Sequence, residues 1–168
     1  MTFGSRYPRK SVESIDFYLD KKKFKLIESM LELESRHPII TFHGTSFKAV
    51  ESILQHGYII PQLDKNNSIA RATHGAAYGI GVYSSPFFDK AIYYTTPDKT
   101  HVYILINMVF LGKAKLIPPR GIGTDFRPPN NGVYCDGSNT RIVYGLEQLI
   151  TGDASRVVPI AVMKISIS

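Results

Sequence analysis

The chain has 168 residues, a formal net charge of +6, a hydrophobic fraction of 43%, ten Tyr, nine Phe and no Trp. This length and composition indicate one globular domain with a sizeable core, and they exclude a disordered or fibrous protein. The longest apolar run, Val102 to Leu111, is too short to cross a bilayer, and the N-terminus lacks the apolar core of a signal peptide, so we expect an intracellular (cytoplasmic or nuclear) protein with no membrane partner.

The single cysteine, Cys135, excludes an internal disulfide and fits a reducing compartment. With only five scattered histidines beside it, the sequence offers no zinc pattern, and we expect no metal. Much of the positive charge lies in the first quarter of the chain, including the lysine-rich run 21–25. A solvated helix face explains this run, and attraction for nucleic acid or a phosphate-bearing ligand is the alternative.

The first quarter of the chain is predicted to be helical. Apolar residues between Ser11 and Ser35 recur at spacings near three and four, which predicts one or two amphipathic helices. Ser11 or Ser14 is the candidate N-cap. Residues 1–37 are therefore expected to form an N-terminal helical segment, ended by Pro38.

The next part of the chain alternates strand, helix and loop signals. Ser46 is the expected cap of the first helix and Gly57 its terminator. The predicted elements, in chain order, are a strand over residues 39–42, a helix over 46–55, an exposed loop over 62–73, a strand at 82–83 and a helix from 85 to about 94.

The second half of the chain is rich in strand signals. They predict strands over residues 101–111, 115–117, 133–135, 141–144 and 157–167, with a Pro- and Gly-rich loop over residues 118–132. Helices early and strands late indicate an α+β fold with one mixed or antiparallel sheet system. Residues 1–168 show no internal repeat, so we expect one domain whose core spans residues 38–168.

His43 stands where a predicted strand turns through glycine. Backbone N–H and C=O groups at such a strand end are left unpaired, and a primary carboxamide satisfies both. Gly44 leaves room for close approach, Thr45 adds a hydroxyl, and His43 has a ring nitrogen for a ribose hydroxyl. Taken alone, a histidine packed in the core is the simpler interpretation of His43.

The segment Gly79-x-Gly81-x-Tyr83 forms the second half of the pattern. Two glycines permit a tight turn beside Tyr83, and Tyr94 is expected on the third turn of the helix that follows. Two tyrosines can sandwich a flat pyridinium ring, although two core tyrosines would also explain them. No strand–GxGxxG–helix unit surrounds the glycines, so they do not predict a phosphate loop. His74 also precedes a glycine, but it follows a polar loop and is the weaker candidate.

Residues 42–45, 52–57 and 74–85 together resemble the catalytic domain of poly(ADP-ribose) polymerase-type ADP-ribosyltransferases. The likeness is to the mono-ADP-ribosylating branch, which also carries a Gly-Ala-Ala-Tyr-Gly-x-Gly stretch. Further matching segments are Lys90-Ala91-x-x-Tyr94, residues 109–112, and residues 139–144 with Gln148 behind them. The resemblance covers about residues 39–167 and implies an ADP-ribosyltransferase-like split β-sheet core with flanking helices.

The resemblance implies that the chain uses NAD as a substrate. His43 would contact the adenosine-side ribose, and Gly44 would hold the nicotinamide carboxamide through its backbone. Thr45 would assist at that amide. Tyr94 and, more edge-on, Tyr83 would flank the nicotinamide ring.

The sequence departs from the family pattern at two positions. Thr140 stands where polymerising members have glutamate, and it completes the expected catalytic set with His43 and Tyr83. Losing such a carboxylate costs about 10² to 10⁴ in rate, which favours mono-ADP-ribosylation over chain elongation. Ala91 stands where many members have a serine that bonds the nicotinamide amide. Glu147, farther along the chain, is a candidate substitute carboxylate.

We therefore expect an NAD-dependent mono-ADP-ribosyltransferase that modifies a protein, with a nucleic-acid end as the less favoured acceptor. Arg71, before the glycines, is expected to reach the NAD pyrophosphate. Two alternatives stand beside this hypothesis. One is a catalytically weak or inactive module that binds NAD or a partner. The other is an RNA 2′-phosphotransferase, which has a histidine where this chain has Tyr83.

Overall fold

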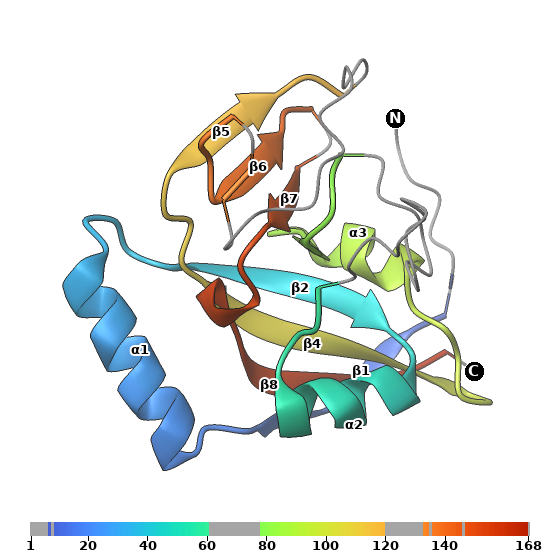
Figure 1. Cartoon of the computed structure of the whole chain (residues 1–168). Helices are drawn as coiled ribbons and strands as arrows, with labels where there is room; N and C mark the ends of the chain where they lie inside the picture. The colour runs from blue at the N-terminus through green and yellow to red at the C-terminus, as the bar shows by residue number, and fades with distance from the viewer. Residues whose placement is uncertain are drawn as a thin grey trace, which may run out of the picture.

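The computed structural model describes residues 7, 9–60, 78–119, 133–134, 136–145 and 147–167. Two four-stranded β-sheets form its centre, and the helices lie around them (Figure 1). Arg71, His74 and most of the predicted loop over residues 118–132 lie outside the described residues. No helix within the described ranges is long and apolar enough to span a bilayer.

The larger sheet is antiparallel throughout, with strand order β1-β8-β4-β2. Its strands are β1 (Ser11–Phe17), β8 (Val157–Ser166), β4 (His101–Val109) and β2 (Ile39–Thr45). Neighbouring side chains on a strand point to opposite faces, yet Ile104 and Leu105 of β4 are both 0% exposed. The centre of this sheet is therefore covered on both faces.

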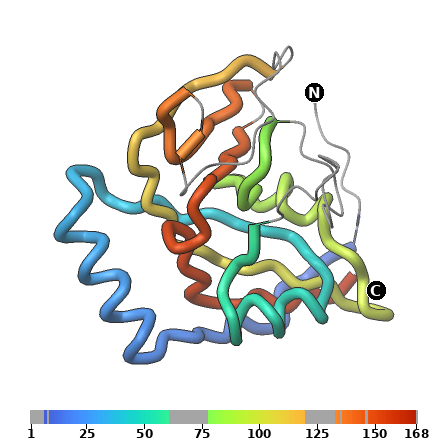
Figure 2. The backbone as a smooth tube through the Cα atoms, viewed as in Figure 1, coloured from blue at the N-terminus to red at the C-terminus, as the bar shows by residue number. Residues whose placement is uncertain are grey.

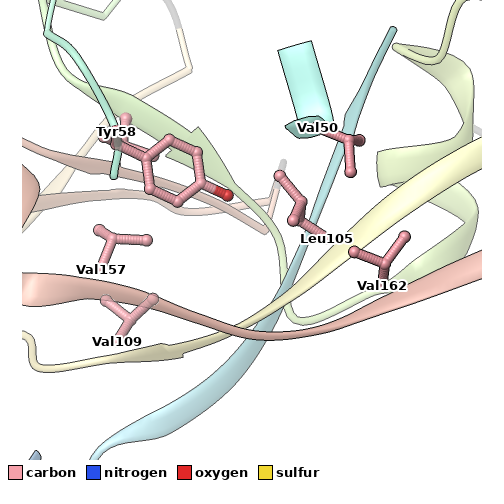
Figure 3. Close-up of a cluster of buried hydrophobic side chains, with 7 residues drawn as sticks. Val50, Tyr58, Leu105, Val109, Val157 and Val162 are labelled. Carbon is pink, nitrogen blue, oxygen red and sulfur yellow. The ribbon is translucent and has the colours of Figure 1, made fainter. Parts of the chain in front are cut away.

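Three helices cover the larger sheet. Helix α2 (Phe47–His56) packs on one face, where Val50 and Tyr58 meet Leu105 of β4 (Figure 3). The opposite face is covered by α1 (Lys21–Leu33) and α3 (Phe88–Tyr93). Figure 2 shows the chain passing from β2 directly into α2, and later from β3 into α3.

The smaller sheet has the order β3-β7-β6-β5. Its strands are β3 (Val82–Ser84), β7 (Gln148–Thr151), β6 (Thr140–Val143) and β5 (Ala114–Ile117), of which β5 and β6 are parallel. Among the described residues, one isolated bridge joins the two sheets: Phe42 N–H donates to the Ser85 carbonyl at 2.7 Å, and Ser85 N–H donates to the Phe42 carbonyl at 3.0 Å. The core is a split, mixed-sheet α+β structure, as predicted.

The predicted helix after β2 is confirmed together with its signals. Ser46 Oγ accepts a hydrogen bond from Ala49 N–H at 3.3 Å, so Ser46 is the N-cap of α2. Gly57 is the C-cap and has a φ of 77°, a conformation that glycine adopts without strain. The predicted strands over 101–111, 115–117, 141–144 and 157–167 are present as β4, β5, β6 and β8.

Several boundaries were predicted wrongly. Residues Ser11–Phe17 form strand β1, paired along β8, so only the second part of the expected N-terminal helical segment is helical. Helix α1 is capped by Asp20, whose side chain accepts from Lys23 N–H at 2.8 Å, and neither candidate serine caps it. Strand β7 was not predicted, residues 133–134 lie outside the strands, and the helix expected over residues 85–94 is shortened to α3.

Removing the Leu105 side chain tests this account of the core. Leu105→Ala is expected to lower the free energy of unfolding by about 2–5 kcal/mol, because the leucine is fully buried between α2 and the sheet. Leu116→Ala is the matched control, since Leu116 is 68% exposed on β5, and its effect is expected within about 0.5 kcal/mol. Urea unfolding measures both. Similar losses in the two variants would contradict the assignment of the core.

Candidate active site

The candidate site lies where β2 and β3 separate after their single bridge. Phe42 and Ser85 exchange both of their backbone hydrogen bonds, so the two strands meet here in antiparallel register. Two residues beyond this pair, Gly44 of β2 faces Tyr83 of β3. Because backbone groups of alternate residues point the same way, the N–H and C=O of Gly44 and Tyr83 are directed into the space between the strands.

The His43 side chain interrupts the ladder at this point. Its Nδ1 lies 2.6 Å from the Tyr83 carbonyl oxygen. A carbonyl oxygen can only accept, so Nδ1 carries the hydrogen and donates it. In a continued ladder the Tyr83 carbonyl would instead accept from Gly44 N–H. His43 Nδ1 therefore takes the place of Gly44 N–H as the donor to the Tyr83 carbonyl. The peptide groups of Gly44 still face the space between β2 and β3.

His43 is also held on the face of the sheet that α2 covers. Its ring meets the Tyr58 ring edge-on, with the centroids 5.3 Å apart and an interplanar angle of 86°. The Tyr58 hydroxyl donates to Asn107 Oδ1 of β4 at 2.9 Å. Burial strongly raises the pKa of Tyr58, so this phenol stays neutral. The imidazole is thus oriented by Tyr83 from one side and by Tyr58 from the other.

Gly44 lies against the end of helix α3. A Cβ atom at this position would lie 1.9 Å from the Ala91 carbonyl oxygen, far inside contact distance. From the sequence, we expected Gly44 to leave room for a ligand. In the structure, the Ala91 carbonyl oxygen of α3 lies where a Gly44 side chain would be. Ala91 is buried in the apolar cluster beneath α3. The glycine therefore allows α3, and Tyr94 at its end, to approach β2.

Tyr83 and Tyr94 are both close to the gap. The Tyr83 hydroxyl donates to the Gly79 carbonyl at 2.7 Å and accepts from Tyr78 N–H at 3.0 Å. Burial raises the pKa of Tyr83 to about 12. Tyr94 is the C-cap of α3 and does not lie on a third turn as expected; burial raises its pKa, while a hydrogen bond with Gln148 acts against this. Tyr78 contributes to the raised pKa of both Tyr83 and Tyr94, and Tyr94 contributes to that of Tyr83, so the three side chains lie close together.

Thr45 and Thr140 occupy different surroundings. Thr45 ends β2 opposite Tyr103, and its carbonyl accepts from Thr96 N–H at 3.4 Å. Thr140, at the start of β6, is 0% exposed, and its hydroxyl donates to Thr151 Oγ1 of β7 at 3.4 Å. Residues His43, Gly44, Tyr83, Ala91 and Tyr94 are thus brought together around the gap, whereas Thr140 is committed to a buried partner in the smaller sheet.

Two features near the site were not anticipated from the sequence. Arg141 is 2% exposed, and it bonds Asp136 Oδ2 through Nε at 3.2 Å. An arginine within an otherwise apolar strand was the signal for this buried pair. Gln148 belonged to a recognised segment but had been given no role, and its side chain bonds Tyr94.

Glu147, the candidate substitute carboxylate, lies on the turn between β6 and β7. Its residue is exposed, and its φ of 51° is in the left-handed region. Ser85 Oγ donates to the Glu147 carbonyl at 2.8 Å, which ties this turn to the bridge between the sheets. Burial lowers the pKa of Lys90, and the negative charge of Glu147 acts against that shift. The carboxylate is therefore close enough to influence Lys90 of α3.

Comparison with known protein families supports the arrangement seen here. A family model described as the poly(ADP-ribose) polymerase catalytic domain matches residues 9–162. The chain therefore belongs to this family, and it has the family's α+β ADP-ribosyltransferase fold. Membership implies NAD-dependent ADP-ribosyltransferase activity with NAD as the substrate, and protein acceptors in general. A comparison with curated protein sequences finds no match.

Asp136 gives a test of the buried charge beside the site. Burial acts to raise its pKa, but hydrogen bonds from Ser138 and the charges of Arg141 and Lys115 outweigh burial and hold the pKa below its ordinary 3.8. A depressed folded-state pKa contributes stability that is fully present well above pH 3.8 and is lost as the pH falls through the folded value. Asp136→Asn is therefore expected to reduce the unfolding free energy most at pH 7 and progressively less toward pH 3.

Urea unfolding at a series of pH values measures this effect. Asp89→Asn is the control, because Asp89 forms an exposed ion pair with Lys10 that contributes at most about 1 kcal/mol. A stability difference between the unmodified protein and Asp136→Asn that stays constant from pH 7 to pH 3 would show that the charge of Asp136 does not stabilise the fold.

Proposed function

We propose that this chain is a mono-ADP-ribosyltransferase that transfers one ADP-ribose unit from NAD to a protein acceptor and releases nicotinamide. The observation that carries the proposal is the interrupted ladder at Gly44. The register of the Phe42–Ser85 bridge turns the N–H and the C=O of Gly44 toward Tyr83, and the His43 ring, not Gly44, bonds the Tyr83 carbonyl.

The gap fits the nicotinamide end of NAD. A primary carboxamide has one acceptor and two donor hydrogens, so it can pair with the N–H and the C=O of Gly44 together. Tyr94 and Tyr83 supply aromatic faces, which favour a positively charged pyridinium ring. Ala91 has no hydroxyl to add a further bond to the amide. We therefore expect the nicotinamide carboxamide to bond mainly to the backbone of Gly44. Thr45, the next residue at the end of β2, is the hydroxyl assigned to assist there.

His43 is assigned to the adenosine-side ribose. Its Nδ1 donates to the Tyr83 carbonyl, so in the neutral ring the second nitrogen, Nε2, is an acceptor suited to a ribose hydroxyl. Arg71 is assigned to the pyrophosphate on the basis of its charge and its place before the glycines. Together with Gly44 and the two tyrosines, these assignments would hold NAD along its whole length.

The reaction breaks the bond between nicotinamide and the ribose carbon and forms a bond from that carbon to the acceptor atom. Tyr83 does not act as a base, because its pKa of about 12 keeps the phenol protonated at neutral pH. Thr140 carries no charge, and its hydroxyl is buried against Thr151. The acceptor must therefore bring its own nucleophile, such as a side-chain carboxylate of a protein, and a hydroxyl on a bound ADP-ribose lacks the activation needed for chain growth.

One observation favours a second candidate, a catalytically weak module that binds NAD or a partner. Position 140 holds a fully buried threonine and therefore supplies no carboxylate to polarise an acceptor, and such a loss costs about 10² to 10⁴ in rate. The two candidates differ in turnover and not in NAD binding. Release of nicotinamide together with transfer of label supports the transferase, whereas binding without either product supports the module.

Substitution of His43 tests the transferase. With labelled NAD and added lysate proteins, His43→Ala is expected to reduce label transfer by at least about 10²-fold, because it removes a ligand contact and releases the Tyr83 carbonyl. His101→Ala is the matched control, since His101 pairs with Glu13 at 3.0 Å on the exposed end of β4, and its transfer is expected unchanged. Circular dichroism checks that both variants fold. Equal transfer by His43→Ala and the unmodified protein would contradict the assignment.

The product length tests the role given to Thr140. Intact-mass spectrometry of a purified acceptor is expected to show single ADP-ribose additions, with no series of longer chains. Thr140→Val keeps the branched shape of the side chain and removes the hydroxyl with its bond to Thr151, so some stability is lost but transfer is expected to stay within about threefold. A loss of transfer of 10²-fold or more in folded Thr140→Val would instead make this hydroxyl a direct participant in the reaction.

A further inference from the structure

We propose that Arg141 is a positioning residue: its buried guanidinium fixes the turn from Tyr78 to Gly81 and thereby sets the orientation of Tyr83. This inference rests on the proposed function only in that Tyr83 borders the NAD site. Arg141 follows Thr140 in strand β6, and its side chain reaches across to a turn more than fifty residues earlier in the sequence.

Three contacts hold the guanidinium in place. Nε donates to Asp136 Oδ2 at 3.2 Å, and one terminal nitrogen donates to the Tyr78 carbonyl at 3.3 Å. The plane of the group lies over the Tyr134 ring, with 4.1 Å between the guanidinium carbon and the ring centroid. A carboxylate, a peptide carbonyl and an aromatic face therefore fix a side chain that is 2% exposed.

The glycine turn is shaped around this cluster. A Cβ atom on Gly79 would lie 2.8 Å from an Arg141 terminal nitrogen, and one on Gly81 would lie 2.5 Å from the Tyr134 hydroxyl. The Tyr134 hydroxyl also donates to the Ile80 carbonyl at 2.8 Å. Arg141 fills the space beside Gly79, whose φ of 104° also favours glycine, and Tyr134, the Thr151 carbonyl and Ile150 together fill the space beside Gly81.

The glycine turn also holds the Tyr83 hydroxyl. Tyr83 donates to the Gly79 carbonyl and accepts from Tyr78 N–H, so both of its hydrogen bonds end on residues that Arg141 contacts. The Tyr83 carbonyl accepts the hydrogen bond from His43 Nδ1. A displacement of the turn would therefore be passed to the ring of Tyr83 and to the imidazole.

Lysine cannot replace Arg141 in this role. Its ammonium is a point charge without the planar fork that bonds Asp136 and Tyr78 while stacking on Tyr134. Arg141→Lys keeps the charge and pairs it with Asp136, so no carboxylate is left buried alone. It is therefore the variant that removes the geometry of the contact while keeping its charge balance.

The experiment combines a spectroscopic reporter with kinetics. A single 3-fluorotyrosine is introduced at position 83, and its ¹⁹F NMR signal is compared between the otherwise unmodified protein and Arg141→Lys. We expect a changed chemical shift in the variant. For NAD we expect KM to rise about tenfold while kcat stays within about threefold, because His43 and Tyr83 bind the substrate. A variant that was merely less folded would lower kcat and leave KM unchanged.

Arg156→Lys is the matched control, since Arg156 is a partly buried arginine paired with Glu34 at the other end of the larger sheet. It is expected to change neither the signal of Tyr83 nor KM. If Arg141→Lys fails to fold, the double variant Asp136→Asn/Arg141→Met serves instead, because it leaves no buried charge unpaired. The same changed signal is expected from it.

An unchanged Tyr83 signal in a folded Arg141 variant would overturn the inference. Absence of transfer by the unmodified protein would overturn the proposed function alone, because the ¹⁹F comparison does not depend on turnover. In that case NAD affinity measured by calorimetry replaces KM. The ¹⁹F signal of Tyr83 could move while NAD affinity stays the same. Arg141 would then fix the turn without positioning Tyr83 for the substrate, and this result would also reject the inference.

Discussion

The site depends on the way in which two sheets are joined at one bridge. Phe42 and Ser85 pair through their backbones, and one step further the His43 ring takes the carbonyl of Tyr83. In a continuous ladder, the N–H and C=O of Gly44 would bond to the backbone of Tyr83. If the two sheets were not joined, nothing would hold Gly44 opposite Tyr83. A side-chain donor inserted after this bridge satisfies the partly buried Tyr83 carbonyl and leaves Gly44 facing the space in which the proposed function places the ligand.

Local sequence signals predicted the elements whose stabilising contacts are local. Ser46 and Gly57 bound α2 through capping groups within a few residues, and the nearly continuous apolar run of β4 reflects burial on both faces at its centre. Strand β1 was missed because its apolar residues also fit helical spacing, and six of its seven residues are exposed. Its state is set by pairing with β8, nearly 150 residues later, which a local pattern does not contain.

The same distinction applies to the site. His43, Gly44, Tyr83 and Tyr94 were predicted together because their motifs resemble a family with a known arrangement. The pairing of Arg141 with Tyr78 was not, because it depends on how the smaller sheet folds back over the turn. The glycines illustrate the limit: their positions were read correctly, but their physical reason lies in neighbouring protein atoms, such as the Ala91 carbonyl beside Gly44.

The proposed separation of NAD binding from catalytic activation agrees with the burial pattern of the smaller sheet. Thr140 and Thr151 are both fully buried and bond one another, so this part of the sheet accommodates hydroxyls without any charge. The next residue, Arg141, does carry a buried charge, but it points to the opposite face and is balanced by Asp136. A carboxylate at position 140 would need a compensating partner on its own face, because a buried unpaired charge is strongly destabilising. The chain instead places its buried ion pair beside the turn that holds the Tyr83 hydroxyl, and under the proposed function this arrangement would keep NAD bound without a carboxylate at position 140.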